Sequence, residues 1–231
     1  TVFSACGVAQ RAACGSWGTL STGLNGTVNS IVASSNGPIL LFGGSFDTAG
    51  GAVASGVAQW SGTAWSKVGN GTNNTVNDMC FDQSKDYLII TGAFTTASSL
   101  TVNRVALWTG TAWTSMSSGF NGIGRALLAH SSGSIIAGGD FTTAGGTTAS
   151  QVARWSHTAS TWTAMSTHVN NRVIGLNEML NGDIVAVGLF STAGGTSACG
   201  AAIWTGSSWS TMAASSLNGQ AAGNATVTAD G

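Results

Sequence analysis

Eight carboxylates are the side chains of this sequence that could carry acid–base chemistry. A glycosidase site needs two of them about 5–10 Å apart, with one pKa raised. No repeat position gathers such a pair, so we expect no catalytic residue. A glycoside-active enzyme stays as the weakest alternative, which a shared pocket for Asp140, Asp183 and His130 would favour. The carboxylates are Asp47, Asp78, Asp82, Asp86, Asp140, Asp183, Asp230 and Glu178.

The three histidines, His130, His157 and His168, fall in three different predicted connections. They form no H-x-H or H-x-x-x-H pair, so the spacing typical of metal ligands is missing. Phosphate loops, dinucleotide fingerprints and nucleophile elbows are also missing. We therefore expect solvated turn histidines, no metal, no cofactor and no enzymatic activity.

Tryptophan and phenylalanine recur at fixed positions of a repeat of about 48 residues, the signature of a repeat architecture. Tryptophan faces could stack on sugars, but their regular placement favours packing between repeats. We interpret both sets as structural. The positions are Trp17, Trp65, Trp113, Trp162 and Trp209, the preceding Trp60, Trp108, Trp155 and Trp204, and Phe46, Phe94, Phe141 and Phe190 of a G-x-F-x-T-A motif.

An asparagine follows the second tryptophan of every repeat. The column either binds a ligand, such as a sugar, or occupies a turn that needs left-handed backbone geometry, which asparagine tolerates. Its members are Asn25, Asn73, Asn121, Asn170 and Asn218. N-glycosylation motifs place acceptors at Asn25, Asn70 and Asn73, in predicted loops where a glycan could stand in solvent.

Four cysteines are present, and two of them share a repeat position. Cys6 and Cys199 both precede a predicted third strand, so a Cys6–Cys199 disulfide would tie the first residues to a late repeat. A Cys6–Cys14 bridge is the competing pair. Cys80 lies in an apolar strand, where we expect a buried, unpaired thiol.

The composition excludes several classes of protein. Charged residues make up 6% of 231 residues and the net charge is −1, so a nucleic-acid partner is not expected. No apolar run could span a bilayer. The chain begins at Thr1 rather than Met, which favours an extracellular or cell-surface protein secreted after removal of a signal peptide.

Each repeat reads as four short strands, best seen at 28–34, 39–42, 57–60 and 65–68, with a loop at 48–51. Four strands every 40–50 residues predict an all-β fold, a five-bladed β-propeller forming one domain over residues 1–231. The blades cover roughly 25–70, 73–118, 121–167 and 170–214. The closing blade, 218–231 plus 1–22, is shared by the two termini.

The repeat resembles a known family of units. Double glycine after the second strand (Gly43-Gly44, Gly138-Gly139) and a tryptophan-bearing hairpin are similar to a kelch-type repeat. The pattern G-G-x-F-T-T-A-G-G…V-A-R-W more closely resembles kelch-like units of secreted and cell-surface proteins, among them the fungal cortical polarity-marker proteins. The resemblance implies the propeller fold but not one function.

We expect a non-catalytic extracellular propeller that serves as a structural or adhesive subunit. Low charge and an incomplete closing blade favour self-association into a homo-oligomer, filament or surface assembly, and glycans would add solubility. The alternative is a multivalent carbohydrate-binding lectin with sites repeated per blade.

Overall fold

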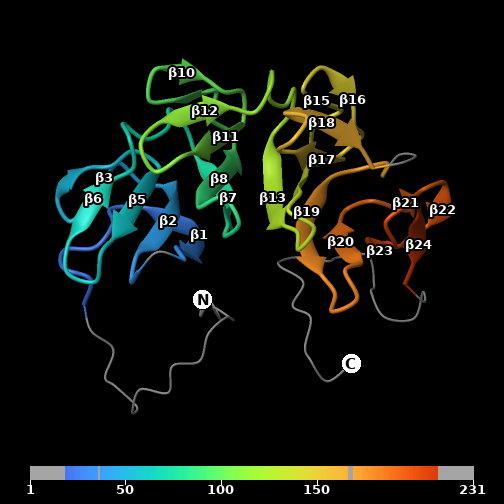
Figure 1. The fold of residues 1–231 in the computed structure, drawn as a ribbon, viewed down its shortest axis with the longest axis horizontal. Coiled ribbons are helices and arrows are strands. Elements are labelled where there is room, and N and C mark those ends of the chain that lie inside the picture. Colours follow the sequence, from blue (N-terminus) through green and yellow to red (C-terminus); the bar gives the residue numbers. More distant parts are fainter. Residues whose placement is uncertain (1–18, 36, 166–168, 213–231) are drawn as a thin grey trace, which may run out of the picture.

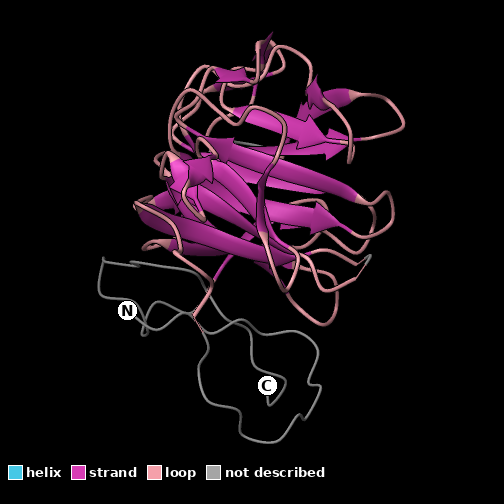
Figure 2. Cartoon of the chain, turned by 90° about the vertical axis from the view of Figure 1, so that its left-hand side faces the viewer, coloured by secondary structure: helices cyan, strands magenta, loops and turns pink. Residues whose placement is uncertain are grey.

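The computed structural model describes residues 19–35, 37–165 and 169–212. All regular secondary structure in these ranges is β-strand, and these ranges contain no helix (Figure 2). Four four-stranded antiparallel sheets, here called blades 1 to 4, follow one another along the chain and stand in an arc around a common centre (Figure 1). The predicted all-β propeller architecture of repeated four-stranded units is therefore confirmed.

Each blade is built from consecutive segments of the chain. Blade 1 contains β1 (Thr27–Ala33), β2 (Leu40–Ser45), β5 (Val57–Trp60) and β6 (Trp65–Lys67). Blade 2 contains β7 (Val76–Asp82), β8 (Tyr87–Gly92), β11 (Val105–Trp108) and β12 (Trp113–Ser115). Blade 3 contains β13 (Gly124–Ala129), β14 (Ile135–Gly139), β17 (Val152–Ser156) and β18 (Thr161–Ala164). Blade 4 contains β19 (Val173–Glu178), β20 (Ile184–Gly188), β23 (Ala201–Trp204) and β24 (Trp209–Thr211).

A short hairpin of two strands, each two residues long, connects the second and third strands of each blade, where the sequence predicted only a loop. In blade 1, Gly50 and Gly51 have φ of +61° and +83°. Two consecutive positive φ angles make the tight turn that suits a hairpin. The hairpins are β3 (Thr48–Ala49) with β4 (Ala52–Val53), β9 (Thr96–Ala97) with β10 (Leu100–Thr101), β15 (Thr143–Ala144) with β16 (Thr147–Thr148), and β21 (Thr192–Ala193) with β22 (Thr196–Ser197).

The innermost strands β1, β7, β13 and β19 contact one another in that order, and the core lies between successive blades. The double glycines do not end the second strand as predicted, because β2 continues through Gly43 and Gly44 to Ser45. A Cβ at Gly43 would lie 2.7 Å from Met79 Sδ of the next blade. Glycine is therefore needed where the blades approach most closely.

The described residues contain four blades. The predicted closing blade, 218–231 plus 1–22, lies outside them except for residues 19–22. The arc of described strands opens between blade 4 and blade 1 (Figure 1). Within the described ranges no helix could cross a lipid bilayer.

Candidate functional site

Four of the repeated asparagines lie in the connection just before a blade and bind the hairpin of that blade. In blade 2, Asn73 Oδ1 accepts the backbone N–H groups of Thr95 and Thr96 at 2.9 and 3.0 Å, and its Nδ2 donates to Thr95 Oγ1 at 2.9 Å. Asn121 and Asn170 make the same three bonds, and Asn25 makes the two acceptor bonds. These side chains hold the connection between blades against the hairpin, and we call this arrangement the asparagine clamp.

The backbone explanation predicted for this column is wrong. Asn25, Asn73, Asn121 and Asn170 are not among the residues with positive φ, whereas Gly71, two residues before Asn73, has φ +74°. Glycine therefore makes the turn, and asparagine is used for its amide. Asn218 lies outside the described residues.

The two tryptophans of each blade face each other across the outer hairpin. Trp155 pairs with Trp162 in register, and their rings tilt at a centroid distance of 5.3 Å. The repeated phenylalanines are buried, and each belongs to the same core cluster as an alanine of its hairpin. The other tryptophan pairs are Trp60 with Trp65, Trp108 with Trp113 and Trp204 with Trp209. Trp17 lies outside the described residues.

The outer tryptophan also bonds to the preceding blade. Trp162 Nε1 donates to the carbonyl of Met116 at 3.0 Å, and Trp209 Nε1 donates to that of Met165 at 2.9 Å. Trp65 Nε1 donates to the carbonyl of Leu20 at 2.8 Å. Trp113 is the exception, since its buried Nε1 has no hydrogen-bond partner among the described residues.

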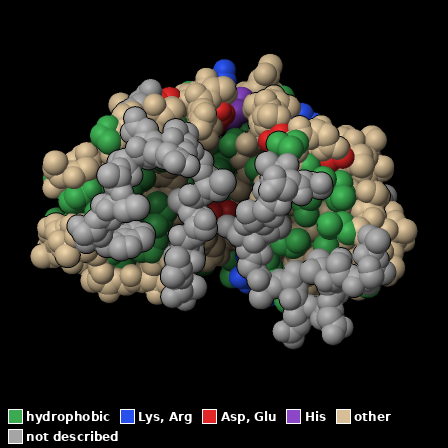
Figure 3. Space-filling view, turned by 90° about the horizontal axis from the view of Figure 1, so that it is seen from below, with side chains coloured by type: hydrophobic (Ala, Val, Ile, Leu, Met, Phe, Trp, Pro, Cys, Tyr) green, Lys and Arg blue, Asp and Glu red, His purple; other side chains and the backbone are tan. Residues whose placement is uncertain are grey.

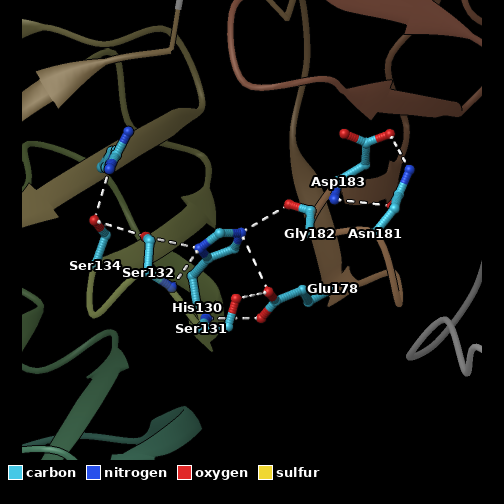
Figure 4. A network of polar contacts seen from close by, with 9 residues as sticks. His130, Ser131, Ser132, Ser134, Glu178, Asn181, Gly182 and Asp183 are labelled. Carbon is cyan, nitrogen blue, oxygen red and sulfur yellow. Dashed lines mark hydrogen bonds and ion pairs between the residues drawn. The ribbon is translucent and has the colours of Figure 1, made fainter.

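The prediction of solvated histidines is wrong for His130. Its side chain is 15% exposed, and its Nε2 donates to the carbonyl of Gly182 at 2.8 Å and lies 3.4 Å from Glu178 Oε1 (Figure 4). Nδ1 is 2.8 Å from Ser132 Oγ and accepts the backbone N–H of Ser132 at 3.1 Å. Glu178 and Gly182 belong to blade 4. The His130 ring therefore connects the turn between β13 and β14 of blade 3 to the turn between β19 and β20 of blade 4.

His157 is likewise enclosed, with a side chain 15% exposed. Its Nε2 lies 3.1 Å from Asp82 Oδ2 of blade 2, an ion-pair distance, although the two atoms are not aligned as a hydrogen bond. Nδ1 accepts the indole N–H of Trp155 at 3.3 Å. The pair therefore bridges blades 2 and 3. His168 lies outside the described residues.

Asp140, Asp183 and His130 do not form a common site. Asp140 follows the last residue of β14 and pairs with Arg125 at 2.6 Å and Arg172 at 2.9 Å, whereas His130 precedes the same strand. Asp183 points away from His130 and accepts from Asn181 Nδ2 at 2.8 Å (Figure 4). The described part of the chain holds no group of three His, Cys, Asp or Glu side chains suited to a metal ion.

Polar residues of the innermost strands form a set of contacts that the sequence reasoning missed. Each innermost strand contains a β-bulge. At the bulges of β1 and β7, Asn29 Nδ2 donates to the carbonyl of Val76, and Asn77 Nδ2 donates to that of Gly124, both at 2.8 Å. The signal available in the sequence was an asparagine at the same position of two successive repeats.

Asp78, next to Asn77, connects three blades. Oδ1 accepts Ser30 Oγ of β1 at 2.9 Å, and Oδ2 accepts the backbone N–H of Leu127 of β13 at 2.8 Å. Burial raises the pKa of Asp78 to about 6, although the bonds from Leu127, Met79 and Ser30 oppose this rise. The protonation of Asp78 therefore responds to mild acid.

The remaining predicted residues differ in their surroundings. Cys80 is buried, as expected, and Cys199 is exposed, while Cys6 lies outside the described residues. Asn70 is exposed and accepts Lys67 Nζ at 2.9 Å through its oxygen. The amides of Asn25 and Asn73 belong to the asparagine clamp.

A family comparison matches residues 15–132 to the model described as the Rax2 C-terminal beta propeller domain. No curated protein sequence matches the chain.

Several solved structures are similar in fold. The GH74 enzyme from Niastella koreensis gives a TM-score of 0.53 with 18% identity over 79% of this chain and 29% of that chain. The WD40 beta propeller domain of Doa1 gives 0.49 with 16% identity over 70% and 48%, respectively. The extracellular domain of BT4673, a two-component system of B. thetaiotaomicron, gives 0.49 with 12% identity over 77% and 20%. This chain thus spans less than half the length of each of these solved chains, and at such identities the likeness concerns the fold alone.

Proposed function

Because this chain belongs to the Rax2 C-terminal beta-propeller family, we propose that it is a non-catalytic, extracellular structural or adhesive module that self-associates. The proposal places the contact at the opening between blades 4 and 1. Seen from this side, hydrophobic side chains appear on both halves of the molecule and charged ones are few (Figure 3).

The observation that carries the proposal is the apolar side of blade 4 that faces away from blade 3. Val185 and Val187 of β20 lie beside Ile203 and Ala201 of β23 and form a separate apolar cluster. In blade 3 the register-equivalent Ile136 and Val152 pack into the core shared with blade 4. This side of blade 4 therefore corresponds to the side that blades 1 to 3 pack against a following blade. Its residues Val185, Val187 and Ala201 are themselves buried, with 7%, 7% and 2% exposure.

Blade 1 presents the complementary face. Phe42 and Trp65 pack edge to face at 4.8 Å, next to Trp60, in a cluster made of blade 1 residues and Leu24. The carbonyl of Leu20 receives the Trp65 N–H, as the carbonyls of Met116 and Met165 do in later blades. This equivalence supports a preceding blade whose last strand ends near Leu20, and hence the five-bladed ring with a closing blade of 218–231 plus 1–22.

The closing blade has no complete second strand in this scheme. A segment of a neighbouring copy would complete it by strand addition, and such a head-to-tail contact generates open filaments. In this scheme the closing blade, completed by the strand of a neighbouring copy, covers the apolar sides of blades 4 and 1. The sparse surface charge of the chain opposes such contacts little.

The mass of the full chain, measured by light scattering over a concentration series at neutral pH, tests self-association. We expect particles larger than one chain, seen as filaments or sheets by electron microscopy. Val185→Asp should raise the concentration for half-assembly about tenfold or more. Val53→Asp, at a site 71% exposed on a blade 1 hairpin, adds the same charge elsewhere and should not. Because Val185 is only 7% exposed, circular dichroism must show that Val185→Asp is folded.

A monodisperse monomer at neutral pH would contradict self-association. If Val185→Asp instead unfolds a monomeric chain, the closing blade is complete without a neighbouring copy and the proposed interface is wrong.

A lectin is the second candidate, favoured by a groove of about 680 Å³ between blades 2 and 3. Tyr87 lines it beside the hydroxyls of Thr109, Thr114 and Ser160. A ring with nearby hydroxyls suits a sugar. Glycan-array binding that is lost in Tyr87→Ala would support this candidate, whereas an array without binding would exclude the glycans it carries.

A further inference from the structure

An open cleft of about 390 Å³ lies between blades 1 and 2, on the side of the hairpins and the asparagine clamp. Its walls come from the end of β2, the start of β5 and the connection between β6 and β7. The lining residues used below are Ser45, Asp47, Ser55, Gly56 and Thr72. The corresponding places between blades 2 and 3 and between blades 3 and 4 show what the fold normally puts there.

In those two places a side chain with N–H donors crosses between the blades. Arg104 occupies the position of Gly56 in blade 2, and its Nη1 donates to the carbonyl of Phe120 at 2.8 Å. Gln151 occupies it in blade 3, and its amide, oriented to satisfy both groups, donates to the carbonyl of Val169. Arg104 and Gln151 have φ of 72° and 65°, a region unfavourable for side chains other than glycine. The chain thus keeps a donor there despite the backbone cost.

Between blades 1 and 2 that donor is missing. Gly56 has the same backbone, with φ +70°, but no side chain, and a Cβ there would overlap Thr72 Oγ1. Thr72 stands where Phe120 and Val169 stand at the other junctions, each bridging to the next hairpin. Two departures from the repeat therefore keep this cleft open and make its wall polar.

A third departure adds negative charge. Asp47 is exposed and takes the position of Thr95, Thr142 and Ser191, whose hydroxyls receive the clamp amides. The cleft lining contains no lysine or arginine. The same cleft therefore gains the Asp47 carboxylate and lacks, at Gly56, the side-chain N–H donor that Arg104 and Gln151 supply at the other junctions.

We propose that this cleft binds the guanidinium group of an arginine side chain presented by a partner protein. The fold itself fills the equivalent place with Arg104, so a guanidinium matches the shape and the acceptors of the site. Its planar fork of donors can engage the Asp47 carboxylate and the hydroxyls of Ser45 and Ser55 together, which a lysine ammonium does less well. The cleft lies between described blades and away from the blade 4 face, so this inference does not depend on self-association.

The test is a titration of the full chain followed by amide chemical shifts in NMR, with N-acetyl-arginine amide as the probe. N-acetyl-citrulline amide is its neutral, nearly isosteric control. We expect saturable shifts at Gly56, Thr72 and Asn73 with arginine, and binding about tenfold weaker or more with citrulline, because charge-assisted hydrogen bonds are lost.

Asp47→Thr should abolish the preference for arginine over citrulline, and it restores the residue that the fold carries in blades 2 and 3. Asp86→Asn, which removes one exposed carboxylate elsewhere and keeps a residue tolerant of φ 58°, should bind arginine within about twofold of the wild type. The double variant Gly56→Arg with Thr72→Val should fill the cleft and prevent the shifts.

Equal binding of arginine and citrulline, an arginine affinity unchanged in Asp47→Thr, or shifts at this cleft with neutral sugars only would each overturn the inference. The absence of shifts at Gly56 and Thr72 at saturating arginine would overturn it as well.

Discussion

Asp78 Oδ2, on β7, accepts a hydrogen bond from the backbone N–H of Leu127 on β13 at 2.8 Å. The other oxygen of the same carboxylate contacts Ser30 of β1. One side chain therefore ties three consecutive blades at their innermost strands. Because its contacts come from different blades, its protonation affects the packing between blades rather than one blade alone.

The stability of the propeller should depend on the charge of Asp78. Its pKa is raised by burial from 3.8 to about 6, so the folded chain holds this proton more tightly than the unfolded chain. This group therefore contributes stability that grows as the pH falls from about 6 to 4 and is lost above pH 6. In Asp78→Asn, the change in unfolding free energy between pH 4.5 and 7.5 should shrink by roughly 2 kcal/mol.

Urea denaturation of the wild type and variant at several pH values measures this difference. Asp86→Asn removes an exposed carboxylate and serves as the control for the loss of one negative charge. A profile unchanged by Asp78→Asn would show that Asp78 has an ordinary pKa in the folded chain.

The asparagine clamp should contribute to stability in every blade. Asn121→Ala removes the acceptor of two backbone N–H groups, those of Thr142 and Thr143, and should lower the unfolding free energy by about 1–3 kcal/mol. Asn121→Asp keeps an oxygen that accepts both N–H groups and loses only the donor to Thr142 Oγ1, so its loss of stability should be smaller. Denaturant titration of the three proteins gives the order. An alanine variant as stable as the wild type would contradict this role and would favour the other interpretation of the repeated asparagines, ligand binding.

The repeat could be recognised in the sequence because the residues that build a blade recur at one spacing. The tryptophan pairs and the strand pattern predicted a four-stranded unit, and the strands at 57–60 and 65–67 lie within one residue of their expected ends. These features depend on neighbours within one repeat, and local pattern captures them.

Contacts between blades were much less predictable. His130 meets the carbonyl of Gly182 in the next blade, 52 positions later. The repeat places both in turns of the same kind, but it does not tell which atoms meet. A histidine in a turn normally faces solvent, so its burial follows from the angle between adjacent blades, which sequence spacing does not encode. The cleft at Gly56 was hidden for the same reason, because its walls come from two blades.

Tryptophan bonds between blades should differ measurably in strength. Trp162→Phe removes the donor to the Met116 carbonyl and leaves that acceptor buried, whereas the Nε1 of Trp113 has no hydrogen-bond partner among the described residues. Both substitutions remove similar ring area. We therefore expect Trp162→Phe to cost about 1 kcal/mol more than Trp113→Phe in chemical denaturation. Equal losses would mean that the indole N–H bond contributes nothing beyond ring packing.

Glycosylation should favour Asn70 over Asn73 when the chain is expressed through a eukaryotic secretory pathway. A glycan on Asn73 would replace a hydrogen of the Nδ2 that donates to Thr95 Oγ1 and would crowd the clamp. At exposed Asn70 the internal bond uses the oxygen, which accepts Lys67 Nζ, so the nitrogen can carry a sugar without breaking it. Mass spectrometry of glycopeptides measures the occupancy, and Asn70→Gln should remove most of the glycan mass in this segment. Higher occupancy at Asn73 in folded, secreted chain would show that the clamp tolerates loss of its donor, and the smaller loss expected for Asn121→Asp would then approach zero.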